Sequence, residues 1–391
     1  MNDFCRGAMR IIQTCGSPSW GGLEMEAVKI ADALQNRGHQ VVLMCQPETQ
    51  IAREAQAHSL EVVPLFRKDA QLLTSIRQLR QFLNKGEWDI IHAHLSHDLS
   101  TIVPALRWGR FSTPLILTRH MASGVSKRDP IHRWLYSRVN RILAISHFIR
   151  ENVLRTCPVE ASRVTTLWNG IELNKYPLER NHRADVRREF NIPQDRLVIG
   201  MVGRITPKKG HRELLKAARI LINATDIPVH FLIVGGASFG EEAYEREVHA
   251  LAKELSLDEC LTFTGFREDV THLMQAMDIF VFPSYKESFG VTLLEAMAMQ
   301  LPVVASSTGA VPEIVVDRET GILIPPGDED ALAGGLLELL REPDLRQQMG
   351  IRGRLRVEQF FQFEGFLENL EVIYQQCMED TLLNSGKSKT N

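Results

Sequence analysis

Two glutamates separated by seven residues form the feature of this sequence with the clearest chemical potential. Glu287 and Glu295 follow the apolar run DIFVFPS, and a helical pattern begins near Gly290 between them. At 1.5 Å per residue, Glu295 lies about 8 Å along the helix axis from that start. We expect one carboxylate to bind a sugar and the other a ribose. The alternative is that Glu287 is a first-turn residue favoured by the helix dipole and Glu295 a solvated helical side chain.

The helix start between the two glutamates is a candidate anion site. The first backbone N–H groups of a helix have no partner within it, and the aligned peptide dipoles favour negative charge there. A diphosphate would therefore fit this position. The N–H groups concerned belong to Phe289, Gly290, Val291 and Thr292.

A basic loop follows the first strand-like run of the second half of the chain. It begins with Gly203 and Arg204 and ends with Lys209 and Gly210. Arginine binds phosphate oxygens as a fork and lysine binds them as a point charge. A departing nucleoside diphosphate needs a metal or fixed cations to compensate its charge, and Arg204 and Lys209 would serve without a metal. The alternative is an exposed basic loop with no ligand.

Two features of the first half could also border a ligand. Gly21 and Gly22, followed by Glu24, lie before a helix, where glycine allows close approach of the backbone. Their spacing is not Gly-x-Gly-x-x-Gly, which disfavours NAD binding. His120 ends a strand and could donate a hydrogen bond or share a proton with a reacting hydroxyl. For the two glycines, the alternative is a plain turn. For His120, the alternative is a structural histidine bonded to backbone.

No metal site is expected from the candidate ligands. His92, His94 and His97 could bind a metal by composition, but two of them lie at strand spacing on one face and no carboxylate or cysteine cluster accompanies them. The segment 328–330 (DED) resembles an Asp-x-Asp metal motif, yet it opens a helical pattern. A helix cap at Asp328 is therefore the favoured interpretation.

These residues lie at the ends of elements that alternate between strand and helix. Short apolar runs typical of buried strands occur in two series, separated by amphipathic patterns such as 72–83. This alternation predicts parallel sheets covered on both faces. The runs cover residues 9–14, 39–45, 60–65, 89–95, 114–119, 141–146 and 163–169, and then 197–205, 229–236, 261–266, 278–284 and 302–307.

The restart of the pattern near residue 197 indicates two α/β domains, each a Rossmann-like, doubly wound parallel sheet. The boundary is expected in the polar stretch 176–195, which gives domains of 1–180 and 181–360. Residues 381–391 are small and polar, and we expect a disordered tail there. Ligands of open α/β sheets bind outside the carboxyl ends of the strands, so a cleft between two facing domains is the expected site.

The composition narrows the class of protein. The chain has 391 residues, of which 44% are hydrophobic, enough for two full cores. Its start lacks the hydrophobic stretch of a signal peptide, and no run approaches the roughly 18 apolar residues of a spanning helix. The six cysteines form no Cys-x-x-Cys pair. We predict a cytoplasmic protein.

The charge is distributed unevenly. Residues 1–180 carry a net charge of +7 and the remainder −10, and residues 105–155 hold ten basic residues with Trp108, Phe111 and Trp134 interleaved. Such a mixture suits the anionic inner face of a membrane, with the protein peripheral to it, or an anionic glycolipid. No nucleic-acid-binding motif accompanies this region, so nucleic acid is not expected. A solvated basic face without a partner is the alternative.

Together, these motifs resemble glycosyltransferase family 4, the group 1 glycosyltransferases, which are retaining enzymes of the GT-B fold. The resemblance runs from the Gly21-Gly22-x-Glu24 loop to the end of the second domain. Its most specific part is 287–298, followed by 301–305, 309–313, 321–323 and 325–328. The resemblance also implies that a terminal helix over residues 361–380 returns to the first domain.

The resemblance implies a role for each matching residue. Glu287 would contact the hydroxyls of the donor sugar, Glu295 the ribose, and Arg204 and Lys209 the departing diphosphate. His120 would match a histidine near the transferred sugar, although Met121 stands where the family usually has Asp. The remaining implied contacts are Gly203 with the diphosphate loop, Phe289, Gly290, Val291 and Thr292 with the diphosphate and sugar, Phe266 and Arg267 with the base, and Gly21 and Gly22 with the donor and acceptor side.

The implied activity is metal-independent, retaining transfer of a hexosyl group from a UDP- or GDP-sugar to a saccharide or lipid-linked acceptor. The nucleotide sugar is a co-substrate, and no cofactor is expected. Bacterial lipopolysaccharide or other surface glycan biosynthesis would use such a reaction. A UDP-sugar 2-epimerase of the same architecture and a non-catalytic nucleotide-sugar or glycan-binding protein are the alternatives.

Overall fold

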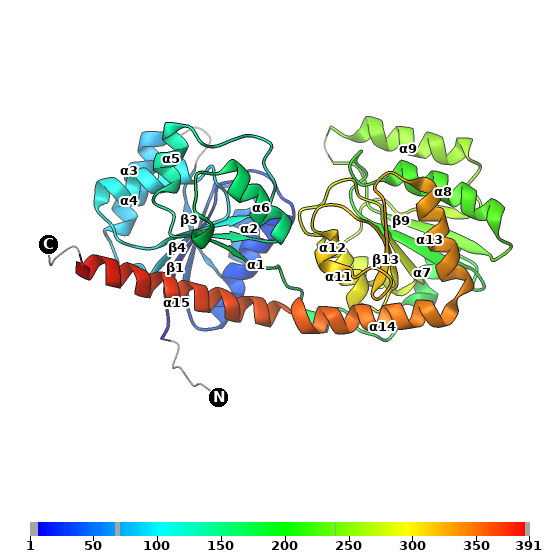
Figure 1. The fold of residues 1–391 in the computed structure, drawn as a ribbon. Helices are drawn as coiled ribbons and strands as arrows, with labels where there is room; N and C mark the ends of the chain where they lie inside the picture. Colours follow the sequence, from blue (N-terminus) through cyan, green and yellow to red (C-terminus); the bar gives the residue numbers. More distant parts are fainter. Residues whose placement is uncertain (1–6, 67–70, 239, 388–391) are drawn as a thin grey trace. The chain divides into compact units, whose positions relative to one another are not determined.

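The computed structural model describes residues 7–66, 71–238 and 240–387. The chain forms two compact units (Figure 1). Unit 1 comprises Met1–Trp168 and Phe366–Asn391, and unit 2 comprises Asn169–Gly365. The segment before the sequence-based boundary at 180 packs within unit 2, because Ile171 forms a parallel bridge with Gln362 and Arg180 donates a hydrogen bond to the Met277 carbonyl.

Unit 1 is built on a parallel sheet. Within the described residues it has seven strands in the order β3-β2-β1-β4-β5-β6-β7. Nearly all side chains of the central strands are buried, which is typical of parallel sheets covered on both faces. The strands are β1 (Arg10–Cys15), β2 (Gln40–Cys45), β3 (Glu61–Pro64), β4 (Ile90–Ala93), β5 (Leu115–Arg119), β6 (Arg141–Ala144) and β7 (Val164–Thr166).

The helices of unit 1 connect these strands. They are α1 (Gly22–Asn36), α2 (Gln50–Ala57), α3 (Leu72–Leu83), α4 (Leu99–Gly109), α5 (Pro130–Tyr136) and α6 (His147–Thr156). Helices α1 and α2 pack together, and so do α3 and α4. Right-handed crossovers place these two pairs on opposite faces, because the strand order reverses between β1 and β4. The ends of β1 and β4 are therefore the topological switch point, where such sheets bind ligands.

Unit 2 repeats the same plan. Among the described residues its sheet has six parallel strands in the order β10-β9-β8-β11-β12-β13, with the switch point between β8 and β11. Its core is made of apolar residues from this sheet and from α8 and α13, which pack together. The strands are β8 (Leu197–Val202), β9 (Val229–Val234), β10 (Leu261–Phe263), β11 (Ile279–Phe282), β12 (Val303–Ser306) and β13 (Gly321–Ile324). The helices are α7 (Arg183–Glu189), α8 (His211–Ala224), α9 (Glu242–Glu254), α10 (Val270–Gln275), α11 (Val291–Ala298), α12 (Val311–Ile314), α13 (Glu329–Arg341) and α14 (Pro343–Phe360).

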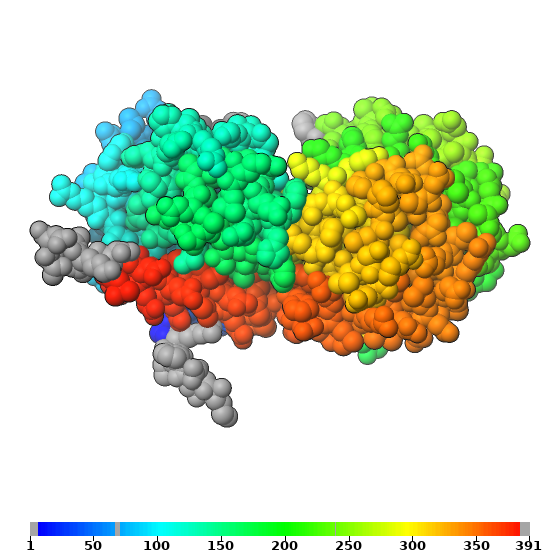
Figure 2. Space-filling model, viewed as in Figure 1, coloured from blue at the N-terminus to red at the C-terminus, as the bar shows by residue number. Residues whose placement is uncertain are grey.

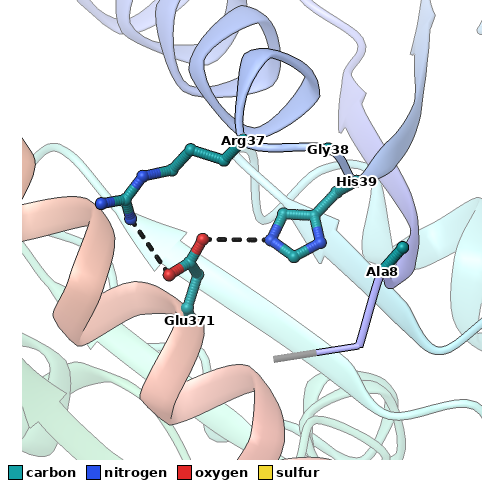
Figure 3. Close-up of a pocket in the computed structure, with 5 residues that line it drawn as sticks. All are labelled: Ala8, Arg37, Gly38, His39 and Glu371. Carbon is teal, nitrogen blue, oxygen red and sulfur yellow. Dashed lines mark hydrogen bonds and ion pairs between the residues drawn. The ribbon is translucent and has the colours of Figure 1, made fainter. Parts of the chain in front are cut away.

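The last helix, α15 (Phe363–Lys387), begins in unit 2 and belongs to unit 1 from Phe366 onward. In unit 1 it is held by a buried carboxylate. Glu371 accepts hydrogen bonds from Arg37 and from His39, each at 3.0 Å (Figure 3). Other residues of this helix, such as Val372, are exposed at the surface of the unit, and the helix is seen at that surface in Figure 2.

The predicted strands are all present, with ends that differ by a few residues. The helix pattern predicted over 72–83 coincides with α3. Strand β13 was not predicted: its apolar run, 322–324, lies between Gly321 and Pro325, which are typical of loops. The expected disordered tail is helical as far as Lys387; its last four residues, 388–391, and the start of the chain, 1–6, lie outside the described residues. No helix in the described parts of the chain has the length and apolar character needed to cross a membrane.

Candidate functional site

An ion pair lies at the switch point of unit 2. Lys209 follows β8, Glu287 follows β11, and the lysine Nζ is 2.7 Å from the glutamate Oε2. The ammonium also lies 5.4 Å from the centre of the Phe282 ring. The two charged side chains are only 24% and 16% exposed, so the pair is largely shielded from water. The sequence indicated both residues for the site but not that they bind each other.

Two glycines bring the loops of this pair together. Gly210 has φ +81°, and a Cβ on it would lie 2.1 Å from the Pro283 carbonyl oxygen. Gly309 has φ +55°, and a Cβ there would lie 1.9 Å from the Glu287 carbonyl oxygen. That same oxygen accepts a hydrogen bond from Ala310 N at 3.1 Å. A larger residue at either glycine would displace the loops that hold Lys209 or Glu287.

Arg204 lies at the exposed rim of the same edge. It directly follows Gly203 after β8, and its Nη1 donates a hydrogen bond to Ser238 Oγ at 3.1 Å. Gly203 itself is approached closely, because a Cβ on Gly235 would lie 2.0 Å from the Gly203 carbonyl oxygen. The guanidinium carries more N–H donors than this one bond uses, which leaves capacity for an anion at the rim.

Helix α11 begins at the predicted position. Gly290 precedes it with φ +111°, and the helix runs from Val291, so the amides of Val291 and Thr292 lie in its first turn. The Phe289 side chain is buried against Phe361, which leaves its backbone as the part able to meet a ligand. Glu295 lies within the helix, and its Oε1 accepts a hydrogen bond from Tyr176 Oη at 2.8 Å.

Phe266 and Arg267, expected beside a base, have different environments. The Phe266 side chain is 79% exposed after β10, which leaves an aromatic face open for stacking. Arg267 is instead bound by the carboxylates of Asp269 and Glu189. Hydrogen bonds to those carboxylates raise the pKa of Arg267 above its ordinary value.

The switch point of unit 1 forms a pocket of about 210 Å³. Leu23, in the first turn of α1 directly after Gly21 and Gly22, lines it together with His120. The structure therefore places Leu23 in one pocket with the predicted histidine, whereas Gly21 and Gly22 themselves are not among the lining residues. His120 is 8% exposed, and its burial, followed by the charge of Arg119, lowers its pKa to about 4. The imidazole is neutral at pH 7.

A chain of hydrogen bonds fixes the tautomer of His120. Gln13 Oε1, which can only accept, lies 3.0 Å from His94 Nε2. His94 Nε2 therefore carries hydrogen, and its Nδ1 accepts from His120 Nε2 at 3.3 Å. This assignment leaves His120 Nδ1 as a hydrogen-bond acceptor. His94 thus supports the candidate histidine, a role that its place in the strand pattern did not reveal.

The residues considered as metal ligands have structural partners. His92 is bound to Tyr374 Oη and Thr118 Oγ1, both at 2.6 Å, and its ring stacks on that of His94. Their predicted position on one face of a strand is confirmed. Asp328 accepts a hydrogen bond from Ala331 N at the start of α13, which confirms the helix cap. The described residues contain no group of three or more His, Cys, Asp or Glu suited to a metal ion.

The basic region 105–155 is not a uniform solvated face. Arg119 is buried, and Arg138 donates hydrogen bonds to the carbonyl groups of Phe111 and Thr113. Trp108 and Trp134, in contrast, are exposed. The segment therefore divides into cations used inside unit 1 and aromatic residues at its surface.

Comparisons with known proteins give the family of the chain. Residues 20–175 match the family Glycosyltransferase Family 4, and residues 182–356 match Glycosyl transferases group 1. The capsular polysaccharide biosynthesis glycosyltransferase CapM of Staphylococcus aureus is 29% identical over 245 residues, which are 61% of this chain and 62% of CapM. The aligned region thus spans less than two thirds of that relative.

Two solved structures share the fold. A glycosyltransferase from Rickettsia africae has a TM-score of 0.86 at 19% identity, covering 95% of this chain and 99% of its own. Anabaena Alr3699/HepE, solved in complex with UDP and glucose, has a TM-score of 0.80 at 22% identity, covering 94% and 99%. The two doubly wound units are thus those of the GT-B fold. The chain belongs to glycosyltransferase family 4, the group 1 glycosyltransferases.

Proposed function

We propose that the chain is a metal-independent, retaining hexosyltransferase that uses a UDP- or GDP-sugar as donor. The observation that carries the proposal is the shielded Lys209–Glu287 pair at the switch point of unit 2. Anabaena HepE was solved with UDP and glucose, which supports a nucleotide sugar as the donor class. The acceptor is a saccharide or a lipid-linked saccharide.

The ion pair suits a donor that carries both phosphate and hydroxyl groups. An ammonium has three N–H donors, so Lys209 keeps two for phosphate oxygens after its bond to Glu287. The second carboxylate oxygen of Glu287 can accept a bond from a sugar hydroxyl. Arg204 at the rim and the first amides of α11 add positive potential for the diphosphate. Glu295 binds the ribose, and the exposed ring of Phe266 stacks on the base.

The reaction follows from this charge distribution. The bond between the anomeric carbon and the diphosphate oxygen breaks, and its electron pair leaves with the diphosphate, which Lys209 and Arg204 stabilise. The acceptor hydroxyl attacks from the face on which the diphosphate departs, so the configuration is retained. Its proton passes to the diphosphate oxygen. Fixed cations supply the compensation that a metal ion would otherwise provide.

The acceptor side belongs to unit 1. His120 Nδ1 accepts a hydrogen bond from an acceptor or sugar hydroxyl and orients it, since the neutral ring has its Nε2 hydrogen directed to His94. Assembly of a surface glycan such as lipopolysaccharide is the proposed setting, and the capsular polysaccharide relative supports it. The exposed Trp108 and Trp134, with basic residues around them, would contact an anionic inner membrane face.

A comparison of two adjacent lysines tests the proposal. Lys209→Met removes the ion pair, whereas Lys208→Met removes an exposed ammonium and leaves the Lys208 carbonyl bond to Tyr285 N in place. We expect Lys209→Met to weaken UDP or GDP binding by about tenfold or more, in calorimetry with EDTA present, because one charge-assisted bond is lost. Lys208→Met should bind like the wild type.

Product analysis then distinguishes the activities. Incubation with UDP- or GDP-sugars and candidate saccharide acceptors should give a glycoside with the donor's anomeric configuration, identified by NMR. A 2-epimerised UDP-sugar formed without acceptor would identify an epimerase. Saturable nucleotide-sugar binding without turnover would identify a binding protein. Equal nucleotide affinity in the two lysine variants would refute the assigned donor site.

A further inference from the structure

The pocket at the switch point of unit 1 has an unusual charge balance. It lies beyond the ends of β4 and β5 and is lined by eleven residues, none of them acidic among those the structure describes. Leu23, Met121 and Ala122 give it apolar walls. Its cationic side chains are Arg119 and Lys127. A small molecule with an apolar part and a negative charge would match this lining.

Among the described residues, no carboxylate neutralises either cation. Arg119, 6% exposed, is bonded to Tyr136 Oη at 3.4 Å and to the Met121 carbonyl at 3.3 Å, which are long bonds to neutral groups. The Lys127 ammonium donates to Ser96 Oγ at 2.7 Å. Within the described parts of the chain, no Asp or Glu oxygen lies within 4.0 Å of either side chain. Buried charges are normally paired, and Arg119 is a buried charge whose hydrogen bonds are long and go to neutral groups, whereas Lys127 is half-buried.

The pKa values of the groups around the pocket agree with two cations that have no carboxylate partner among the described residues. Burial, and then the charge of Arg119, lower the pKa of Lys127, as expected for a cation without a counter-ion. The neighbouring imidazoles do not compensate. His120 and His94 both have pKa values lowered by burial, so they are neutral at pH 7. The positive potential of the pocket therefore comes from Arg119 and Lys127 alone.

We propose that this pocket binds an anionic group of the acceptor, a phosphate or a carboxylate, with Lys127 and Arg119 as its partners. The inference rests on the proposed function, because it treats unit 1 as the acceptor side. It adds a requirement for acceptor charge. Lys127 supplies a half-buried ammonium held by Ser96, and Arg119 supplies the buried charge. The anion would bring a neighbouring hydroxyl to His120, which lines the same pocket.

The test measures binding of inorganic phosphate and glucose 6-phosphate to the full chain by calorimetry, with saturating UDP present. Lys127→Met should weaken both by about tenfold or more, whereas Lys127→Arg should restore them. Arg128→Met is the matched control, because Arg128 is adjacent and exposed and donates to the Leu154 carbonyl. It should change the affinity less than about twofold. Neutral glucose should bind the wild type more weakly than its phosphate.

The outcomes separate this inference from the donor assignment. Tight UDP binding without any phosphate or glucose 6-phosphate binding overturns the anion pocket and leaves the proposed function standing. Anion binding that depends on Lys127, in a protein that binds no nucleotide, supports the pocket and overturns the donor assignment. Binding unchanged in Lys127→Met also overturns the pocket. Displacement of glucose 6-phosphate by phosphatidylglycerol vesicles would assign the anion to a lipid headgroup, and no displacement to a soluble sugar phosphate or acid.

Discussion

Replacement of Glu371 by glutamine should selectively destabilise unit 1. His39 Nδ1 accepts a hydrogen bond from Met9 N, so its Nε2 carries hydrogen and must donate to Glu371 Oε1. Arg37 donates to the other carboxylate oxygen. The carboxylate is 4% exposed and faces two donors (Figure 3). A glutamine side chain has one oxygen and one NH₂ group, so it can accept from only one of them.

The expected loss of stability follows from the replacement of two acceptor oxygens by one oxygen and one NH₂ group. One hydrogen bond is lost and one donor is left facing an NH₂ group, which costs about 1–3 kcal/mol. The Arg37 side chain is 26% exposed, so the lost ionic attraction adds less than about 1 kcal/mol. We therefore expect the free energy of unfolding of unit 1 to fall by about 2 kcal/mol. Because the carboxylate belongs to α15, the loss measures how strongly this helix is attached to the unit.

Tryptophan fluorescence provides a selective assay. All five tryptophans of the chain lie at or before Trp168, hence in unit 1. Urea unfolding followed by fluorescence should thus show the loss, while the transition that appears in circular dichroism but not in tryptophan fluorescence, which reports unit 2, stays unchanged. Glu368→Gln is the control, because this residue is on the same helix and near the same Arg37, at 4.0 Å, but is 61% exposed. Equal stability of the Glu371 and Glu368 variants would refute the reasoning.

Three further changes test other parts of the structure. Gly309→Ala should lower kcat/KM by tenfold or more, since the new Cβ, about 1.9 Å from the Glu287 carbonyl oxygen, forces that loop to move; unchanged kinetics would contradict the packing. Gly334→Ala, at an exposed position of α13 with no atom within 4 Å of the new Cβ, should raise the free energy of unfolding by about 0.5–1 kcal/mol in urea. His92 and His120, with pKa values lowered to about 3 and about 4, bind fewer protons folded than unfolded, so each removes stability as the pH drops from about 6.5 to about 4, whereas Asp98, whose pKa burial raises to about 7, adds stability over that range; the fluorescence-detected stability of a His92→Gln variant should therefore fall less on acidification than that of the wild type. A His92→Gln variant that keeps the full pH dependence would argue against this assignment.

Much of the fold can be predicted from the sequence because its elements carry strong periodic signals. The run at 39–45 is apolar and β-branched, and it forms the buried strand β2. The apolar pattern at 72–83 includes Ile76, Leu79 and Leu83, which α3 buries together with Ser75. Leu72 and Leu73, in the first turn, belong to the same pattern but are exposed. Strand β13 was missed, because Gly321 and Pro325 on either side of its apolar run are typical of a loop. The start of unit 2 is set by contacts such as Tyr176 with Glu295, far apart in sequence and without a local pattern.

In the candidate site, the residues can be predicted from local motifs, but the contact between them cannot. A motif can mark Lys209 and Glu287 as chemically interesting, because each follows a strand and parallel strands end at one edge. Their ion pair spans 78 positions, and it depends on β11 pairing with β8 rather than with β9 or β10. The packing of the whole unit determines which strand pairs with β11, so no short segment of the sequence predicts the ion pair.

The pocket beside His120 marks a further limit. Lys127 is one of ten basic residues in its segment, and nothing in the local sequence separates it from Arg138, whose charge is used on backbone carbonyls. What distinguishes Lys127 is its place: its ammonium donates to Ser96 and lines the pocket beside His120, whereas Arg138 lies outside that pocket. Which basic side chain of the segment reaches the pocket depends on contacts between residues far apart in sequence, so the order of residues does not predict it. In the proposed anion site, the counter-charge for Lys127 and Arg119 would come from the acceptor.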